Sequence, residues 1–404
     1  MDGQIVIALL IFLLGSSPAL GKTKPSTLNE LLVRLKNKPV VKIRVGKSLN
    51  NVWISGTDLK RKIHTNNDLK RFSGKKTVKF NCQSFSRQNR RFLKKPVLLA
   101  SLQSNTGLLS LNKEKFLGQL HIVTSSTKQS CDVINETTIE NYISSLLSKE
   151  MNSVWPIEAL KAQAVAARTY ALHMMRSKRV SRELGVEAYY DLESSEKHQV
   201  GGNFFDATTE TRLASRKTEG LVLLTKKGTL TPAFFHAKCG GRTLRPEQVW
   251  DNRVAGYKEG VLCPFCDGRG KRTWNGKLKF KRFKKFLIWA RKKQYLKRLP
   301  RFKKGLKVRV APDNRFRNNI RLYVGGNVYK IPKPLFRKYF GRVIVPSNNF
   351  KLKYAGGKFV MKGEGLGHGV GMCQIGALDL AKKGWGYKKI LAHYFPGHKI
   401  KKVY

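Results

Sequence analysis

The chain has 404 residues, of which 80 are Lys or Arg and 25 are Asp or Glu, giving a formal net charge of +55. An apolar fraction of 41% and an aromatic fraction of 10% are ample for a folded core, so charge-driven disorder of the whole chain is excluded. So much positive charge predicts a polyanionic partner, for which nucleic acid, anionic lipid and cell-wall polymer all qualify.

The first residues have the layout of a secretory signal. Residues 5–15 are a continuous apolar run, too short for a comfortable membrane span, and Ala19-Leu20-Gly21 follows as a small-x-small pattern. No Lys or Arg precedes the run, which departs from the usual pattern, and an uncleaved anchor is the alternative. We predict a signal peptide over 1–21, a lead-in over 22–40, and export to the periplasm, cell wall or exterior. Because exported proteins rarely meet nucleic acid, we expect an anionic wall or membrane surface as partner and no nucleic acid.

A β-rich subregion is predicted over residues 41–130. Short runs rich in Val and Ile are separated by Gly, Asn and Ser, which is typical of strands. These runs are VVKIRVG, NVWISG, KTVKFNC, PVLLAS and QLHIVTS. Within this subregion Cys82 could pair with Cys131, which the sequence does not decide.

Two helices are predicted next. The first covers Glu136–Leu147, and the second covers Pro156–Met175, where Pro156 suits the first helical turn. Ile157, Leu160 and a series of alanines recur at helical spacing in the second segment. A seam of alanines allows another element to approach closely, so this helix is expected to be central.

Glu150 lies between these two helices and has two interpretations. It is an acidic residue beside Trp155 and Pro156 in a very basic chain, which is compatible with a chemical role. From spacing alone, however, a helix-end charge balanced by Lys149 is the favoured explanation. Trp155 in turn could shield the carboxyl group or belong to the core.

The C-terminal part mixes strands and helices, so we predict an α+β fold whose parts form one substrate cleft. Residues 269–310 are a basic segment, and the apolar residues through Phe280–Leu299 recur as in an amphipathic helix. This segment is either a solvated face docked on the core or a surface for a polyanion. Four β runs follow: RLYVGG, RVIVPS, FKLKY and KFVMK.

A cluster of metal-ligating residue types lies in the same part. His236 and Cys239 are separated from Cys263 and Cys266 by a short interval, and each pair has two intervening residues. This spacing matches a closed, structural zinc site, and no organic cofactor is expected. A disulfide joining Cys263 to Cys266 or Cys239 is the alternative.

Residues 363–376, GEGLGHGVGMCQIG, form a glycine-dense loop that contains His368 and Gln374. The glycines permit positive φ and close approach of the backbone to a ligand. No Gly-Lys-Ser/Thr follows, so the loop is not a Walker phosphate loop. We expect helices after it, over Leu378–Lys383 and Tyr387–Tyr394.

Three stretches in this order resemble the signatures of the SpoIID/LytB family, the stage II sporulation protein D group of bacterial cell-wall proteins. They are Glu150–Leu172, TPAFFHAKCGGRTLRPEQVW (231–250) and GEGLGHGVGMCQIGALDLAKKGWGYKKILAHYFPG (363–397). The resemblance extends from about Val40 to the C-terminus, so we expect one SpoIID-like domain over residues 41–404.

The resemblance implies a lytic transglycosylase that cleaves peptidoglycan glycan strands, in sporulating members strands stripped of stem peptides. Glu150 occupies the place of the family's catalytic glutamate, as a general acid/base that leaves 1,6-anhydromuramic ends. Such an acid should have a raised pKa from partial burial, which Lys149 would oppose. The family's Glu-x-Pro step has Asn152 here in place of proline.

The remaining polar residues of the glycine-dense loop and of the alanine-rich helix have further expected roles. Arg168, Tyr170, His368 and Gln374 are candidate substrate contacts. Metal ligation by Cys and His in some relatives supports His236 and Cys239 as ligands. The alternative function is a non-catalytic peptidoglycan-binding module that enhances an amidase, with the amidase as a protein partner.

Overall fold

The computed structural model describes most of the chain from residue 38 onward. The predicted signal peptide and nearly all of the lead-in lie outside the described residues. The described ranges are 38–83, 96–125, 130–178, 180–181, 188–194, 204–250, 254–257, 259–263, 266, 273–301, 308–312 and 319–404. No helix in these ranges is long and apolar enough to cross a membrane.

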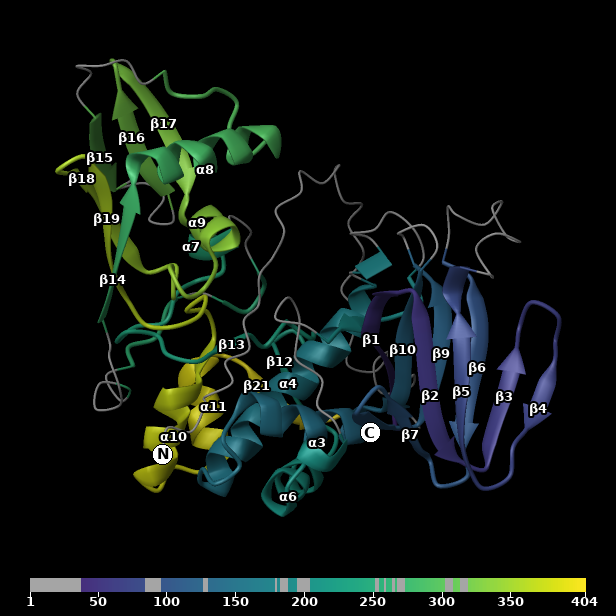
Figure 1. Ribbon diagram of the computed structural model, residues 1–404. Helices are drawn as coiled ribbons and strands as arrows, with labels where there is room; N and C mark the ends of the chain where they lie inside the picture. Colours follow the sequence, from purple (N-terminus) through teal and green to yellow (C-terminus); the bar gives the residue numbers. More distant parts are fainter. Residues whose placement is uncertain are drawn as a thin grey trace.

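The N-terminal unit consists of two sheets packed face to face, on the right in Figure 1. The larger sheet has the order β11-β1-β10-β9-β6-β3-β4, and the smaller has the order β5-β2-β7-β8. The strands are β1 (Val40–Leu49), β2 (Asn51–Thr57), β3 (Leu59–Ile63), β4 (Leu69–Arg71), β5 (Lys75–Asn81), β6 (Leu98–Ser104), β7 (Leu108–Leu111), β8 (Glu114–Leu117), β9 (Gln119–Thr124), β10 (Cys131–Thr138) and β11 (Leu192–Glu193). All five predicted β runs of this region form strands.

Alternation of side chains explains why the two sheets pack together. On β2, Val52 and Ile54 are buried while Trp53 between them is 48% exposed. Strand residues point alternately to the two faces of a sheet, so one face of β2 enters the core. On β6, Ala100 and Leu102 enter the same core from the other sheet.

A disulfide joins the two sheets. Cys82, directly after β5, is bonded to Cys131 at the start of β10, with a Cα–Cα distance of 5.6 Å and a sequence separation of 49. Replacing both cysteines with alanine should lower the free energy of unfolding by about 2–4 kcal/mol, because a closed loop restricts the unfolded chain. Urea unfolding of the double variant measures this. Wild type in reductant should match the variant, and an unchanged midpoint in both would contradict the assignment.

The central unit is helical and is built around α4 (Ile157–Ser177), which confirms the predicted alanine-rich helix. Fourteen of its 21 residues are buried, so it is covered on nearly all sides. It packs against β11 and against four helices and a further strand, which surround it in Figure 1. These are α3 (Ile139–Glu150), α6 (Thr209–Lys217), α10 (Gln374–Lys382), α11 (Tyr387–Tyr394) and β12 (Leu221–Leu224).

Helix α3 differs from the predicted Glu136–Leu147 by about one turn. Glu136 pairs with Lys42 in the ladder between β1 and β10, so the strand continues to Thr138. The Thr138 hydroxyl then caps the helix by accepting from the backbone N–H of Asn141. As a result α3 ends at Glu150, which becomes a helical residue.

Residues 273–364 form a third unit with its own core, at the upper left in Figure 1. Its sheets have the orders β14-β19-β18 and β15-β16-β17. The elements are β14 (Thr273–Lys279), α8 (Phe280–Lys292), β15 (Val308–Pro312), β16 (Asn319–Val324), β17 (Asn327–Pro332), α9 (Lys333–Phe340), β18 (Phe350–Ala355) and β19 (Lys358–Glu364). Helix α8 buries Phe283, Phe286 and Leu287, but it ends seven residues before the predicted Leu299. Gln294 adopts a left-handed φ of 62°, which stops the helix.

The remaining short elements connect the units. β12 pairs with β21 (Lys399–Lys402), and β13 (Phe235–His236) pairs in parallel with β20 (Met372–Cys373). A short helix α7 (Glu247–Trp250) and a 3₁₀ turn η2 (Phe204–Asp206) complete the described elements. The structure is therefore of the predicted α+β class.

Candidate functional site

Glu150 is buried at the C-terminal end of α3, with 3% of its surface exposed. Burial raises the pKa of the Tyr142 phenol, and the nearby charges of Glu150 and Tyr170 raise it further. The three side chains therefore share one region between α3 and α4. Burial disfavours the charged form of a carboxyl group, which is the property that a general acid needs.

Lys149 does not account for Glu150 by charge balance. Its ammonium lies 2.9 Å from a carboxylate oxygen of Asp206, in the 3₁₀ turn η2. The side chain of Lys149 is thus directed to a different carboxylate. The interpretation of Glu150 as a helix-end charge balanced by Lys149 loses its main support.

Glu158, the other acidic residue of this stretch, has a structural role. The backbone N–H of Tyr387 donates to Glu158 Oε2 at 2.8 Å, and Lys161 forms an ion pair with its other oxygen. Burial opposes ionisation, but these hydrogen bonds hold the pKa of Glu158 below its ordinary value. Glu158 therefore fixes the start of α11 against the start of α4.

Tyr170 connects the Glu150 region to the glycine-dense loop. Its ring centroid lies 6.0 Å from that of Phe234, which lies 6.1 Å from that of His368. The ring centroid of His368 also lies 5.1 Å from that of Trp250. The loop residue predicted as a substrate contact is thus connected to Tyr170 of α4 through the ring of Phe234.

The backbone of Val370 fixes the tautomers of two buried histidines. Nδ1 of His236 lies 3.0 Å from Val370 O, and because a carbonyl only accepts, this nitrogen carries the proton. The Val370 N–H donates to Nδ1 of His368 at 3.0 Å, so the proton of a neutral His368 lies on Nε2. His236 Nε2 is then an acceptor without a hydrogen-bond partner within the described ranges, and His368 Nε2 is a donor that interacts with the backbone of Phe235 outside strict hydrogen-bond geometry.

Both histidines are neutral at pH 7. Burial lowers the pKa of His236 to about 4. Burial, followed by the charges of His236 and Arg337, lowers the pKa of His368 well below its ordinary value. Their ring centroids lie 5.6 Å apart. The two buried rings therefore present one acceptor nitrogen and one neutral donor nitrogen.

Two further buried polar side chains are amides on α10 and α4. Gln374, the first residue of α10, is 3% exposed, and its Nε2 has no hydrogen-bond partner in the described part of the chain. Gln163 on α4 is fully buried, and among the described residues neither its Oε1 nor its Nε2 has such a partner. Gln163 is not among the residues predicted from the sequence. The signal was a polar residue inside the alanine seam, since a buried amide without a partner is costly in a purely structural role.

Arg168 was predicted to contact the substrate, but the structure places it in the protein interior. It is fully buried, and its Nε and Nη2 donate to the two carboxylate oxygens of Glu140 at 2.8 and 2.7 Å. Nη1 and Nη2 also donate to the carbonyls of Leu221 and Ser215. The guanidinium makes these hydrogen bonds within the protein, and they join α4 to α3, β12 and α6.

Four cysteines converge where the Cys239 turn meets the start of α10. The sulfur atoms of Cys239, Cys263, Cys266 and Cys373 all lie within 4.8 Å of one another, and all four are buried free thiols. The group contains Cys373 in place of the predicted His236. The parallel pairing of β13 with β20 sets His236 opposite Cys373, and the imidazole of His236 turns to Val370 O.

This sulfur group fits a tetrahedral metal ion. Zn–S bonds of about 2.3 Å place four thiolates about 3.8 Å apart, which is compatible with the observed spacing. The two sulfurs of Cys239 and Cys266 lie 3.5 Å apart. Around the group, the Cys263 sulfur contacts the Tyr394 hydroxyl at 3.0 Å, and Gly376 N–H donates to the Cys373 sulfur.

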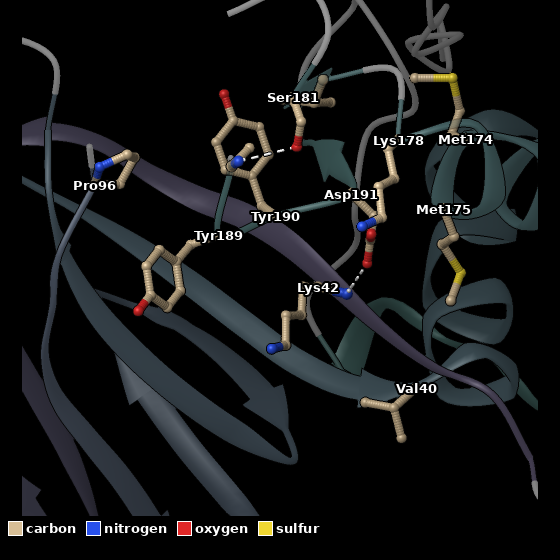
Figure 2. Close-up of a pocket in the computed structure, with 12 residues that line it drawn as sticks. Val40, Lys42, Pro96, Met174, Met175, Lys178, Ser181, Tyr189, Tyr190 and Asp191 are labelled. Carbon is tan, nitrogen blue, oxygen red and sulfur yellow. Dashed lines mark hydrogen bonds between the residues drawn. The ribbon is translucent and has the colours of Figure 1, made fainter. Parts of the chain in front are cut away.

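The cavity drawn in Figure 2 is lined by other residues. It has a volume of about 620 Å³ and lies between β1 and the C-terminal end of α4, with Tyr189, Asp191 and Met175 in its wall. None of its twelve described lining residues is a predicted site residue.

Comparison with known proteins identifies the segment that contains Glu150. Residues 127–225 match the SpoIID family, whose description is Stage II sporulation protein. The chain belongs to the SpoIID family. The matched residues cover α3 and α4, and therefore Glu150 and Tyr170, whereas His368 and Gln374 lie outside them.

Several curated proteins are similar to this SpoIID family member. An uncharacterized protein of Brachyspira hyodysenteriae is 32% identical over 272 residues, covering 66% of this chain and 67% of that protein. Stage II sporulation protein D of Bacillus amyloliquefaciens is 26% identical over 278 residues, covering 65% and 74%. The amidase enhancer of Bacillus subtilis is 25% identical over 337 residues, covering 73% of this chain but only 45% of that protein.

Proposed function

We propose that this protein is an exported lytic transglycosylase that cleaves peptidoglycan glycan strands, with Glu150 as its general acid and base. Membership of the SpoIID family supports a cell-wall-related function. The burial of Glu150 beside Tyr142 and Tyr170, within the segment matched to the family, is the observation that carries the proposal.

One carboxyl group is sufficient for this reaction. Glu150 in its protonated form gives its proton to the glycosidic oxygen as the bond from that oxygen to the anomeric carbon breaks. The resulting carboxylate then accepts the proton of the muramic acid 6-hydroxyl, whose oxygen bonds to the same anomeric carbon. Glu150 regains its proton, no water is consumed, and the product has a 1,6-anhydro ring.

His368 and Gln374 are proposed to position the glycan. The Nε2–H of His368 and the amide of Gln374 are neutral groups, so they can bind sugar hydroxyls without a strong effect on the Glu150 proton. Gln163 is a further candidate for this role, because its buried amide is available. Tyr170, through its contact with Phe234, is proposed to hold the two parts of the site together.

Product analysis tests the reaction type. Peptide-stripped glycan strands digested by the full chain should yield muramic acid ends lighter by one water than the ends left by hydrolysis, as measured by mass spectrometry. Products with ordinary reducing ends would show a hydrolase, and no cleavage would favour the second candidate below. Intact peptidoglycan in a parallel digestion shows whether the stem peptides must first be removed.

The second candidate is a non-catalytic module that enhances an amidase. It is favoured by the similarity to the amidase enhancer of Bacillus subtilis, although this chain spans less than half of that protein. Under this candidate the partner would be a wall amidase, and Glu150 would have no chemical task.

We further propose that the four cysteines hold a structural zinc ion. Four thiolates leave no open position on the metal, so the ion would fix the Cys239 turn to the start of α10 and take no part in the reaction. No organic cofactor is proposed.

Replacing Cys373 with serine tests this metal site. Protein purified without a histidine tag should contain about one zinc per chain by elemental analysis, and Cys373→Ser should contain almost none, because a serine hydroxyl is a poor zinc ligand. His236→Ala should keep its zinc, since His236 lies outside the sulfur group. Loss of zinc in His236→Ala with retention in Cys373→Ser would restore the ligand set predicted from sequence.

A further inference from the structure

The unit formed by residues 273–364 has almost no negative charge. It contains 28 Lys or Arg residues and two acidic residues, Asp313 and Glu364. In the N-terminal unit, by contrast, basic side chains such as Arg44, Arg61 and Lys42 form ion pairs with acidic residues. The positive charge of the third unit therefore has little compensation from within that unit.

Part of this charge is gathered on one face of the three-stranded sheet β14-β19-β18. The opposite face of the sheet is buried, with Leu278, Leu352 and Phe359 in the core against α8. Six lysines alternate with these buried positions and are all exposed. We call them the lysine face: Lys277, Lys279, Lys351, Lys353, Lys358 and Lys362.

The strand register brings like charges together on the lysine face. Lys279 lies directly opposite Lys358, and Lys351 lies directly opposite Lys362. Like charges in directly opposed positions destabilise a sheet. None of the six forms an ion pair within the described ranges. A sheet that tolerates this repulsion is suited to an external anion that relieves it.

The geometry of the lysine face favours an extended anion with closely spaced charges. Neighbouring strands are about 4.8 Å apart, and alternate residues of one strand are about 7 Å apart. A bare glycan strand carries only one carboxylate per disaccharide, which is a sparser array than the lysines. A polymer with a phosphodiester in every repeat matches the array more closely.

The side chains between the lysines distinguish among phosphate-bearing partners. Val360 is half-buried at the centre of the face, and the other described positions there are Thr273, Asn275, Ala355 and, at one end opposite Thr273, the acidic Glu364. The aromatic Tyr354 lies on the core side, where its ring is 4.8 Å from that of Phe359. The face thus has no aromatic ring for stacking on bases and no large exposed apolar side chain for insertion into a bilayer.

We propose that the lysine face is a docking surface for a linear polyol-phosphate polymer of the cell envelope. This goes beyond the proposed cleavage of glycan strands and does not depend on it. The basic segment predicted as a polyanion surface from sequence, residues 269–310, contributes Lys277 and Lys279 to the face. The other four lysines come from β18 and β19.

Titration of the full chain with a labelled synthetic poly(glycerol phosphate) tests the proposal. The variant Lys277→Gln/Lys351→Gln/Lys362→Gln should bind about 100-fold more weakly at about 0.1 M salt, and its slope of log affinity against log salt should fall by about 2. The matched control, Lys60→Gln/Lys75→Gln/Lys76→Gln, removes the same charge from exposed positions of the N-terminal unit. It should bind nearly as tightly as wild type.

Three outcomes would overturn the proposal. Equal losses in the two triple variants would show that net charge, and not the lysine face, determines binding. Tighter binding of wild type to anionic phospholipid vesicles, single-stranded DNA or peptide-stripped glycan would identify a different partner. Absence of binding to poly(glycerol phosphate) would exclude it directly. Lys353→Gln/Lys358→Gln provides a second variant of the same face and should also weaken binding if the first variant fails to fold.

Discussion

Glu150→Gln should lower the rate of glycan cleavage by about 10²–10⁴-fold, the usual contribution of a general acid/base. Glutamine keeps the size of the side chain but can neither give a proton to the glycosidic oxygen nor accept one from the 6-hydroxyl. The measurement is the rate at which 1,6-anhydro ends form from peptide-stripped glycan strands. The proposed mechanism requires a protonated Glu150, and glutamine is likewise neutral and similar in size, so the urea midpoint of the variant should equal or exceed that of wild type.

Glu158→Gln is the matched control for this variant. Glu158 lies in the same stretch of sequence but is tied to Lys161 and to the backbone of Tyr387. Its replacement should leave the cleavage rate within a few-fold of wild type while lowering stability slightly. Equal rates for wild type and Glu150→Gln would contradict the proposed role of Glu150 as general acid and base. If stimulation of a wall amidase then persisted in both, the enhancer function would be favoured.

The positions of the main elements could be predicted from local patterns. The alternation of buried and exposed side chains on β2 and the alanine seam of α4 are patterns of neighbouring residues. The strand and the helix could therefore be predicted from the sequence. The start of α3 was not, because Glu136–Thr138 is held in β10 by pairing with β1, nearly one hundred residues earlier. The end of α8 at Lys292 depends on one left-handed residue, Gln294, whose conformation the amphipathic pattern did not indicate.

In the candidate site, too, residues with a distinctive local sequence could be predicted, whereas residues brought together by distant pairing could not. Glu150 was found because its sequence context is distinctive, and Cys239, Cys263 and Cys266 because of their spacing. Cys373 was missed as a member of the sulfur group, since only the parallel pairing of β13 with β20 brings it there. Arg168 was expected near the substrate because it lies close in sequence to the alanine seam. Its partner, Glu140, lies on another helix, and sequence spacing alone gave no indication of the pair.

Arg168→Met should lower the free energy of unfolding by about 3–5 kcal/mol, the cost of removing one partner from a buried ion pair. The guanidinium is fully buried, and its bidentate contact with Glu140 is accompanied by hydrogen bonds to two carbonyls. Methionine fills a similar volume but leaves the Glu140 carboxylate without its cation. Arg168→Lys should recover only part of the loss, because an ammonium cannot reproduce the planar fork. Arg216→Met, at an exposed position of α6, should change stability by less than about 0.5 kcal/mol.

The pH dependence of this difference separates the ion pair from simple packing. Burial opposes ionisation of Glu140, but its hydrogen bonds with Arg168 hold its pKa below the ordinary value of 4.5. A depressed carboxyl pKa stabilises the fold at pH values above the ordinary one and loses this effect as the pH falls through the folded value. Urea unfolding at several pH values should therefore show the full difference between wild type and Arg168→Met near pH 7 and a smaller one below pH of about 4. A difference that stayed constant over this range would mean that Arg168 stabilises the protein by packing alone, and the ion pair would not be what anchors α4 to α3.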